Sequence, residues 1–313
     1  MKKGLYIGMI YTVTFSPAVD YVMDVKELKV GAINRSLGEH AMPGGKGINV
    51  SIVLANFGTR SIATGFLGGF TGQYIEDELK KMNINSGFIK VDGLTRINVK
   101  LRGGEETAIN GQGPHITDEK IEELMKQLEK LTSDDLLVIS GTVPKTLPDN
   151  IYETILERIK GNNVRVIIDS TKEILLKTLR FHPVLVKPNQ EELEEMFGVT
   201  IHNNDELIEN AKKLLTLGAQ NVIVSLGKHG ALLVNDKETI LSGCPQGKVK
   251  NTVGAGDSLV AGFIDEYIKT GNIVMALYKG IATGSASACS ENLATKEEVQ
   301  ALLDKLEDWK GAN

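Results

Sequence analysis

The stretch that decides the fold is Leu136-Leu137-Val138-Ile139, which is apolar at every position and runs into Ser140. A strand without alternation is typical of a parallel sheet that is buried on both faces. Short runs of this kind recur along the chain, and stretches with the apolar periodicity of helices follow them. This rhythm predicts an α/β core with helices on both sides of a mostly parallel sheet. We expect strands at 9–15, 62–66, 136–140, 164–169, 184–186 and 222–225, and helices at 47–57, 74–82, 118–130, 148–160, 190–197, 205–215 and 258–268.

Two segments, around 22–42 and 87–111, interrupt this rhythm because polar and apolar residues alternate along them. Alternation predicts antiparallel hairpins with one face in water. In the second segment Arg96, Asn98 and Lys100 share one face, because side chains alternate along a strand. One interpretation of these cations is an ordinary solvated strand face. The other is a small lid that closes over a ligand.

The composition excludes several classes of protein. A chain of 313 residues that is 42% apolar and 24% charged can bury a large core, in one domain or two. The net charge of -5 arises from 35 basic and 40 acidic residues that are interspersed, so no footprint for nucleic acid or an anionic membrane is visible. Cys244 and Cys289 lie far apart without other metal-ligand residues nearby, which argues against a disulfide framework or a zinc site.

The start of the chain gives no targeting signal. Residues 1–8 contain two lysines but lack the apolar stretch and cleavage site of a signal peptide, and Met9 could equally be the native start. No stretch approaches the roughly 20 apolar residues that span a bilayer. We therefore expect a soluble, cytoplasmic protein that binds neither membrane nor nucleic acid.

A glycine-rich turn, Gly254-Ala255-Gly256-Asp257, stands directly before the helix expected at 258–268. A helix start offers unpaired N–H groups and the positive end of the helix dipole, and glycines let an anion approach the backbone. Asp257 could then reach a substrate hydroxyl beside a bound phosphate. The alternative is a flexible turn with a carboxylate that caps the helix. The turn is neither a Walker A loop nor a dinucleotide fingerprint, because the residues that define both are missing.

A second glycine cluster, Pro43-Gly44-Gly45-Lys46-Gly47-Ile48-Asn49-Val50, lies between the first hairpin segment and a helix. Its backbone, lysine and asparagine could contact sugar hydroxyls or a phosphate. The alternative is a hinge that leads into the helix. The residues of this cluster leave both interpretations open.

Taken together, Gly44-Gly45-Lys46-Gly47-Ile48-Asn49 and Thr252-Val253-Gly254-Ala255-Gly256-Asp257-Ser258 resemble the two signatures of the PfkB, or ribokinase-like, carbohydrate kinase family. Further matches stand in the family's order at 16–20, 140–144, 187–192 and 225–230, so the resemblance covers about residues 9 to 292. It implies a single ribokinase-like domain over 1–313. That domain would be a three-layer α/β sandwich with a mostly parallel central sheet and a small β-sheet lid, formed by segments at about 20–43 and 88–112.

The resemblance also implies roles at the nucleotide end of the site. Asp257 would be the base, and the backbone of Gly254, Ala255 and Gly256 would form an anion hole for the transferred phosphoryl group. The cofactors would be ATP and Mg²⁺, with Asn189 and Glu192 organising the metal through water and phosphate. From the residues alone, positions 190–192 would be an acidic first helical turn. The residues expected to bind nucleotide are Lys187, Asn189, Glu192, Ser225, Gly227, Gly230, Thr252, Gly284 and Ser287.

At the acceptor end, the resemblance implies contacts to a sugar phosphate. Arg96 would bind a phosphate through two parallel hydrogen bonds, and Lys100 would add a point charge. The run from Thr95 to Leu101 is similar to that of 1-phosphofructokinases, whereas Thr142 stands where family members often carry serine. The acceptor residues expected are Asp20, Gly44, Gly45, Lys46, Asn49, Arg96, Asn98, Lys100, Ser140 and Thr142.

The implied reaction is ATP-dependent phosphorylation of fructose 1-phosphate to fructose 1,6-bisphosphate. Two alternatives stay open, a tagatose-6-phosphate or fructose-6-phosphate kinase and a non-catalytic regulator that binds a sugar phosphate. A nicotinamide-dependent oxidoreductase is excluded because its fingerprint is missing. Exposed lid edges favour a homodimer that pairs through the lid strands.

Overall fold

The computed structural model describes residues 8–103 and 107–311. The expectation about the start of the chain therefore falls largely outside the described residues, as do positions 104–106 of the second lid segment. Within the described ranges, none of the helices combines the length and the apolar character that crossing a bilayer requires.

The central sheet confirms the expected α/β core. Its strands follow the order β14-β13-β12-β11-β10-β9-β1-β4-β5, with β6 paired to β4 beside this path. Every pairing from β5 to β12 is parallel, whereas β12, β13 and β14 are antiparallel. The bounds are β1 (Ile10–Thr14), β4 (Ser61–Gly68), β5 (Asn85–Ser86), β6 (Ile89–Val91), β9 (Leu136–Ser140), β10 (Arg165–Asp169), β11 (Leu185–Val186), β12 (Asn221–Ser225), β13 (Ala231–Asn235) and β14 (Thr239–Ser242).

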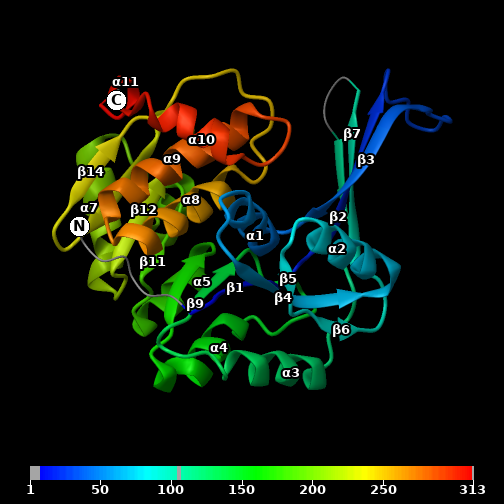
Figure 1. Cartoon of the computed structure of the whole chain (residues 1–313), viewed down its shortest axis with the longest axis horizontal. Helices are drawn as coiled ribbons and strands as arrows, with labels where there is room; N and C mark the ends of the chain where they lie inside the picture. The colour runs from blue at the N-terminus through cyan, green and yellow to red at the C-terminus, as the bar shows by residue number, and fades with distance from the viewer. Residues whose placement is uncertain (1–7, 104–106, 312–313) are drawn as a thin grey trace.

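Helices cover both faces of the sheet, as Figure 1 shows for α3 and α4 on one side and α8, α9 and α10 on the other. Alternate residues of the buried strands contribute to two separate apolar clusters, because successive side chains point to opposite faces. The helices are α1 (Lys46–Asn56), α2 (Gly69–Lys81), α3 (Asp118–Leu128), α4 (Ile151–Ile159), α5 (Lys172–Thr178), α6 (Gln190–Phe197), α7 (Asn204–Thr216), α8 (Ala255–Thr270), α9 (Ile273–Cys289), α10 (Lys296–Leu303) and α11 (Leu306–Trp309).

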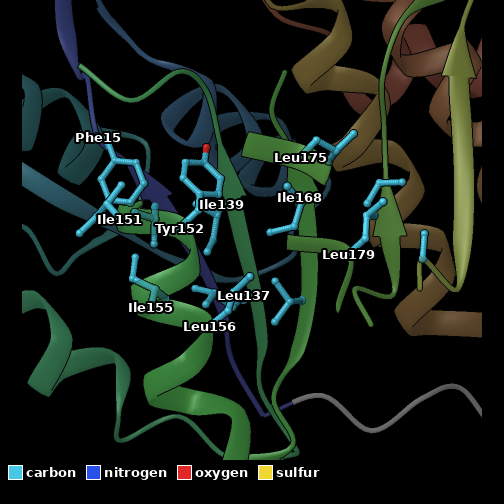
Figure 2. Close-up of a cluster of buried hydrophobic side chains, with 14 of the residues drawn as sticks. Phe15, Leu137, Ile139, Ile151, Tyr152, Ile155, Leu156, Ile168, Leu175 and Leu179 are labelled. Atoms are coloured by element: carbon cyan, nitrogen blue, oxygen red, sulfur yellow. The ribbon is translucent and has the colours of Figure 1, made fainter. Parts of the chain in front are cut away.

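One of these clusters fixes the loop that follows β9. Figure 2 shows Tyr152 of α4 beside Phe15 and Ile139, and its ring meets that of Phe15 edge-on at 5.4 Å. The Tyr152 hydroxyl donates to the carbonyl oxygen of Gly141 at 2.6 Å. Gly141 has a φ of 108°, which an L-residue rarely adopts. The core therefore holds the backbone just after Ser140, where the sequence predicts acceptor residues.

A second, four-stranded sheet forms the lid, which projects from one end of the core in Figure 1. Its strands are β2 (Ala18–Val25), β3 (Ser36–Gly44), β7 (Arg96–Arg102) and β8 (Thr107–Asn110), in the order β3-β2-β7-β8. The predicted antiparallel hairpins are present, and a parallel pairing of β2 with β7 joins them. At the base of the lid, Gly44, Ala18 and Arg96 stand opposite one another in one row across three strands.

The second lid segment begins later than predicted. Residues 89–91 form β6, which pairs with β4 of the core instead of joining the lid. The buried side chain of Ile89 packs in the apolar cluster of α3 and α4, and this explains why the segment stays with the core. The lid proper starts at Arg96.

Candidate active site

A cavity of about 1120 Å³ lies between the lid and the carboxyl ends of the central strands. This is where open α/β sheets bind ligands. Segments far apart in the sequence meet at its wall, including both glycine clusters. The predicted residues on the wall are Asp20, Gly45, Lys46, Asn49, Arg96, Asn98, Ser140, Thr142, Lys187, Asn189, Glu192, Ser225, Gly227, Gly230, Thr252, Gly254, Ala255, Gly256, Asp257 and Gly284.

Three predicted residues are not on this wall. Gly44 lies behind Asp20, so close that a Cβ atom on it would be 2.7 Å from that carboxylate. Lys100 is paired with Asp20. Ser287 is buried between helices, where its hydroxyl bonds Ser258 at 2.7 Å and accepts the amide of Ala294 at 2.9 Å. Small residues on α9 therefore serve helix packing as well as the cavity, since Gly284 does line it.

Asp257 lies in the first turn of α8 and is 5% exposed. Asn49 of α1 donates to its Oδ2 atom at 2.8 Å. Burial and the negative charge of Asp169 raise the pKa of Asp257 to about 6, although Asn49, Lys46 and Lys187 act in the opposite direction. A carboxyl group with this pKa can accept a proton near neutral pH.

The start of α8 has the features of an anion site. Gly254 precedes it with a φ of 80°, and no side chain caps the helix. The first turn of the helix lines the cavity beside Asp257, with the positive end of the helix dipole there. Gly256 leaves room for Lys187, because a Cβ atom at this position would lie 3.3 Å from the lysine Nζ atom. A phosphoryl group at this point would meet amides, an ammonium group and a carboxylate.

Asp169, at the end of β10, contacts both Lys187 and Lys46. The sequence predicted these two lysines for different parts of the site, the nucleotide and the acceptor. Lys187 Nζ lies 3.2 Å from its Oδ1 atom, and Lys46 Nζ lies 3.7 Å from its Oδ2 atom. Burial by itself would lower the pKa of Lys187, but Asp169, Asp257 and Glu192 together raise it. The raised pKa keeps Lys187 charged, and both lysines line the cavity.

The lid builds one end of the cavity, where the sequence predicts acceptor residues. Asp20 of β2 accepts from Asn98 Nδ2 at 2.8 Å and faces Lys100 Nζ at 3.3 Å. Arg96 donates to the carbonyl oxygen of Ser16 at 3.1 Å, and its buried Nε atom has no partner among the described residues. Burial lowers the pKa of Arg96, whereas Asp20 raises it. Cationic and hydroxyl-binding groups therefore meet at this end.

Asn189 and Glu192 form a reciprocal capping box at the start of α6. The Asn189 Oδ1 atom accepts the Glu192 amide at 2.7 Å, and the Glu192 Oε2 atom accepts the Asn189 amide at 2.9 Å. Within the described residues no cluster of three or more acidic, His or Cys side chains could hold a metal ion by itself. A half-buried Glu192 on the cavity wall, capped by Asn189, fits Mg²⁺, which keeps waters and uses substrate phosphates as ligands.

Asp169 and Thr14 lie at the cavity but were not predicted from the sequence. Both end central strands, and Thr14, Ser140 and Asp169 stand in register on the neighbouring strands β1, β9 and β10. The signal that could have found them is position, because the carboxyl ends of parallel strands meet at one edge of the sheet.

Comparison with known proteins gives the same family as the two glycine-rich segments indicate. The model of the pfkB family carbohydrate kinases matches residues 13–300. The chain is 46% identical over 298 residues to a 1-phosphofructokinase of Bacillus subtilis, with 95% of this chain and 98% of that protein covered. It is 35% identical over 300 residues to a D-tagatose-1-phosphate kinase of Bacillus licheniformis, with 96% and 99% covered. The structure of phosphofructokinase-2 from Escherichia coli with substrates and products is 28% identical, with a TM-score of 0.89 and 96% and 100% covered.

Proposed function

Because this chain belongs to the pfkB family of carbohydrate kinases, we propose that it transfers the γ-phosphoryl group of MgATP to the free C6 hydroxyl of fructose 1-phosphate. The product would be fructose 1,6-bisphosphate. The 1-phosphofructokinase of Bacillus subtilis, with nearly half of its residues identical, supports this acceptor.

The position of Arg96 supports a phosphorylated sugar as the acceptor. Its guanidinium group lies at the acceptor end of the cavity, and the buried Nε atom lacks a partner among the described residues. A guanidinium group binds phosphate through two parallel hydrogen bonds, which makes a phosphorylated sugar a better ligand than a free sugar. Asp20 and Asn98, which are hydrogen-bonded to each other, would bind the hydroxyl groups of the ketose.

Asp257 would take the proton from the C6 hydroxyl as the new P–O bond forms and the bond to the β-phosphate oxygen breaks. The amides at the start of α8 would stabilise the charge on the transferred group. Lys46 and Lys187 would neutralise phosphate charge from the two sides. Magnesium, held through water by Asn189 and Glu192, would supply further positive charge at the ATP phosphates. The lid would exclude water that otherwise hydrolyses ATP.

An ADP-release assay tests the proposal with fructose 1-phosphate, fructose 6-phosphate, tagatose 1-phosphate, tagatose 6-phosphate and fructose. We expect the highest kcat/KM for fructose 1-phosphate. A preference for tagatose 1-phosphate would favour the activity of the Bacillus licheniformis relative. A preference for free fructose would refute the role of Arg96. Arg96→Met should raise the KM for the phosphorylated sugar by about 10- to 100-fold, since a hydrogen bond to a charged group contributes about 1.5–3 kcal/mol.

We also propose a homodimer that pairs through the lid. Ile97 and Ile109 lie on the face of the lid opposite Asp20, and they are 38% and 61% exposed. An apolar face on an open sheet is a typical site of pairing. Light scattering after size exclusion would contradict the proposal if it showed a monomer at micromolar concentration. A cytoplasmic location stays a prediction.

A further inference from the structure

Five buried polar atoms without a hydrogen-bond partner in the described chain belong to residues at the lid base or at central strand ends beside the cavity. Three of them, Thr14 Oγ1, Ser140 Oγ and Asp169 Oδ2, form a row across β1, β9 and β10. A buried polar atom without a partner costs about 1–3 kcal/mol, so such atoms gather where function requires them. Asp169 is the one member of the row that carries a charge.

The position of Asp169 connects the two halves of the cavity. Lys46 begins α1, separated by one residue from lid strand β3, which ends at Gly44, and therefore belongs to the acceptor side. Lys187 precedes the capping box of α6 and belongs to the nucleotide side. The two carboxylate oxygens of Asp169 each face one of these lysines. The side chain is 2% exposed, so water screens these charges weakly.

A purely structural ion pair would have a different geometry. Asp265, also buried, is hydrogen-bonded by two lysines and a threonine. Asp169 has a contact of 3.7 Å on one side, which is too long for a hydrogen bond, and its Oδ2 atom stays unsatisfied. A carboxylate held in this incomplete way can orient its lysines and still leave them able to contact an incoming phosphate.

We propose that Asp169 is a positioning residue for phosphoryl transfer, which holds Lys46 and Lys187 at the point where the acceptor side and the nucleotide side meet, next to Asp257. This proposal rests on the kinase function proposed above. The groups that face Asp257 are Asp169 from β10, Lys46 and Asn49 from α1, and Lys187, which Glu192 of α6 also influences. The negative charge of Asp169 helps Asp257 to remain a competent base beside two cations.

Asp169→Asn tests the proposal, because asparagine keeps the shape and removes the charge. We expect kcat to fall by about 100-fold, as for a misplaced reacting group. We expect a non-hydrolysable ATP analogue to bind at least as tightly as to the wild type, because both lysines become available. The acid limb of the pH profile of kcat should move to lower pH, since Asp257 loses a negative neighbour. Asp169→Glu should restore part of kcat.

The control is Ser170→Ala, which alters the adjacent buried side chain without changing charge. It should leave kcat and the acid limb unchanged. An acid limb that stays in place in Asp169→Asn would overturn the proposal. So would a lower melting temperature with normal kcat, which indicates a structural role, or weaker nucleotide binding that excess Mg²⁺ restores, which indicates a metal ligand. The profile is measured with whichever sugar the wild type phosphorylates, so an incorrect acceptor and an incorrect role for Asp169 give different results.

Discussion

Helix α8 carries two buried carboxylates, Asp257 in its first turn and Asp265 about 12 Å further along, and their surroundings differ. Lys269 and Lys279 donate to Asp265 at 2.5 and 2.6 Å, and Thr59 adds a third hydrogen bond. Among the described residues, Asp257 has one hydrogen bond, from Asn49. The pKa of Asp265 lies below its ordinary value because these three partners outweigh burial, whereas burial and Asp169 raise that of Asp257.

The difference distinguishes Asp265, a carboxylate that holds the fold, from Asp257, the carboxylate that we propose as the base. Asp265 ties α8 to α9 through Lys279 and to the start of β4 through Thr59, and Lys279 also lies 5.2 Å above the Phe57 ring. Asp257 lies on the cavity wall and has one side-chain hydrogen bond among the described residues. Three hydrogen bonds satisfy the Asp265 carboxylate and stabilise that end of α8. The Asp257 carboxylate has fewer partners, as is common for groups at functional sites.

The largest effect should come from Asp257→Asn. We expect kcat to fall by about 10²- to 10⁴-fold, because the variant lacks the base. The protein should melt at least as high as the wild type at pH 7.5, because a poorly compensated buried charge has been removed. ADP release and thermal melting measure the two properties. Near-normal turnover would reject the role of Asp257.

Asp265→Asn should give the reverse pattern. Removing one partner of a buried ion pair costs about 3–5 kcal/mol of stability, because Lys269 and Lys279 lose their counter-charge. Urea unfolding measures this loss, and kcat per folded molecule should change little. Lys269→Met is the matched control, and it should cost less because this side chain is about half exposed. A large loss of kcat at unchanged stability would remove the distinction between the two carboxylates.

Lowering the pH should affect the contributions of Asp257 and Asp265 differently. Below pH 6, kcat should fall by about tenfold per pH unit as Asp257 becomes protonated. Its raised pKa means that Asp257 destabilises the fold above pH 6, and this cost declines progressively as the pH falls from about 6 towards the ordinary pKa of 3.8. The contribution of Asp265, whose pKa is lowered, is present above pH 4 and is lost only below it. The difference in melting temperature between Asp257→Asn and the wild type should therefore shrink between pH 7.5 and pH 5. A difference that stays constant over this range would contradict the raised pKa.

The smallest effect concerns Thr59→Val. The hydroxyl of Thr59 is one of three partners of Asp265, so its loss should cost about 1 kcal/mol and leave kcat unchanged. Urea unfolding checks this value. A loss as large as that of Asp265→Asn would mean that the two lysines depend on Thr59 for their placement.

The central strands could be predicted from the sequence because each is a short apolar run bounded by polar turns. Helix α9 was not expected, because Ala, Gly and Ser fill much of it and it lacks the wide polar face of an amphipathic helix. The antiparallel strands β13 and β14 were missed as well. They depend on the turn at Gly230, which has a φ of 90° and no room for a side chain. Long-range packing decides both features.

The candidate site was predictable where glycines and a carboxylate stand together, as at Asp257. It was not predictable at Asp169, which precedes Ser170 and Thr171 and therefore resembles an ordinary turn residue before a helix. The glycines before Asp257 distinguish it from Asp265 in the sequence, but they do not show how differently the two carboxylates are paired. The partners that separate them come from elsewhere in the chain.

The row of Gly44, Ala18 and Arg96 at the base of the lid has a mechanical consequence. This row is where lid strands β2, β3 and β7 join the core, and it includes Arg96, the residue that would bind the sugar phosphate. A bound acceptor would then contact the lid at its junction with the core, whereas the nucleotide would not. A fluorophore at Val30, in the exposed turn between β2 and β3, would sense occupancy by the sugar across the length of the lid.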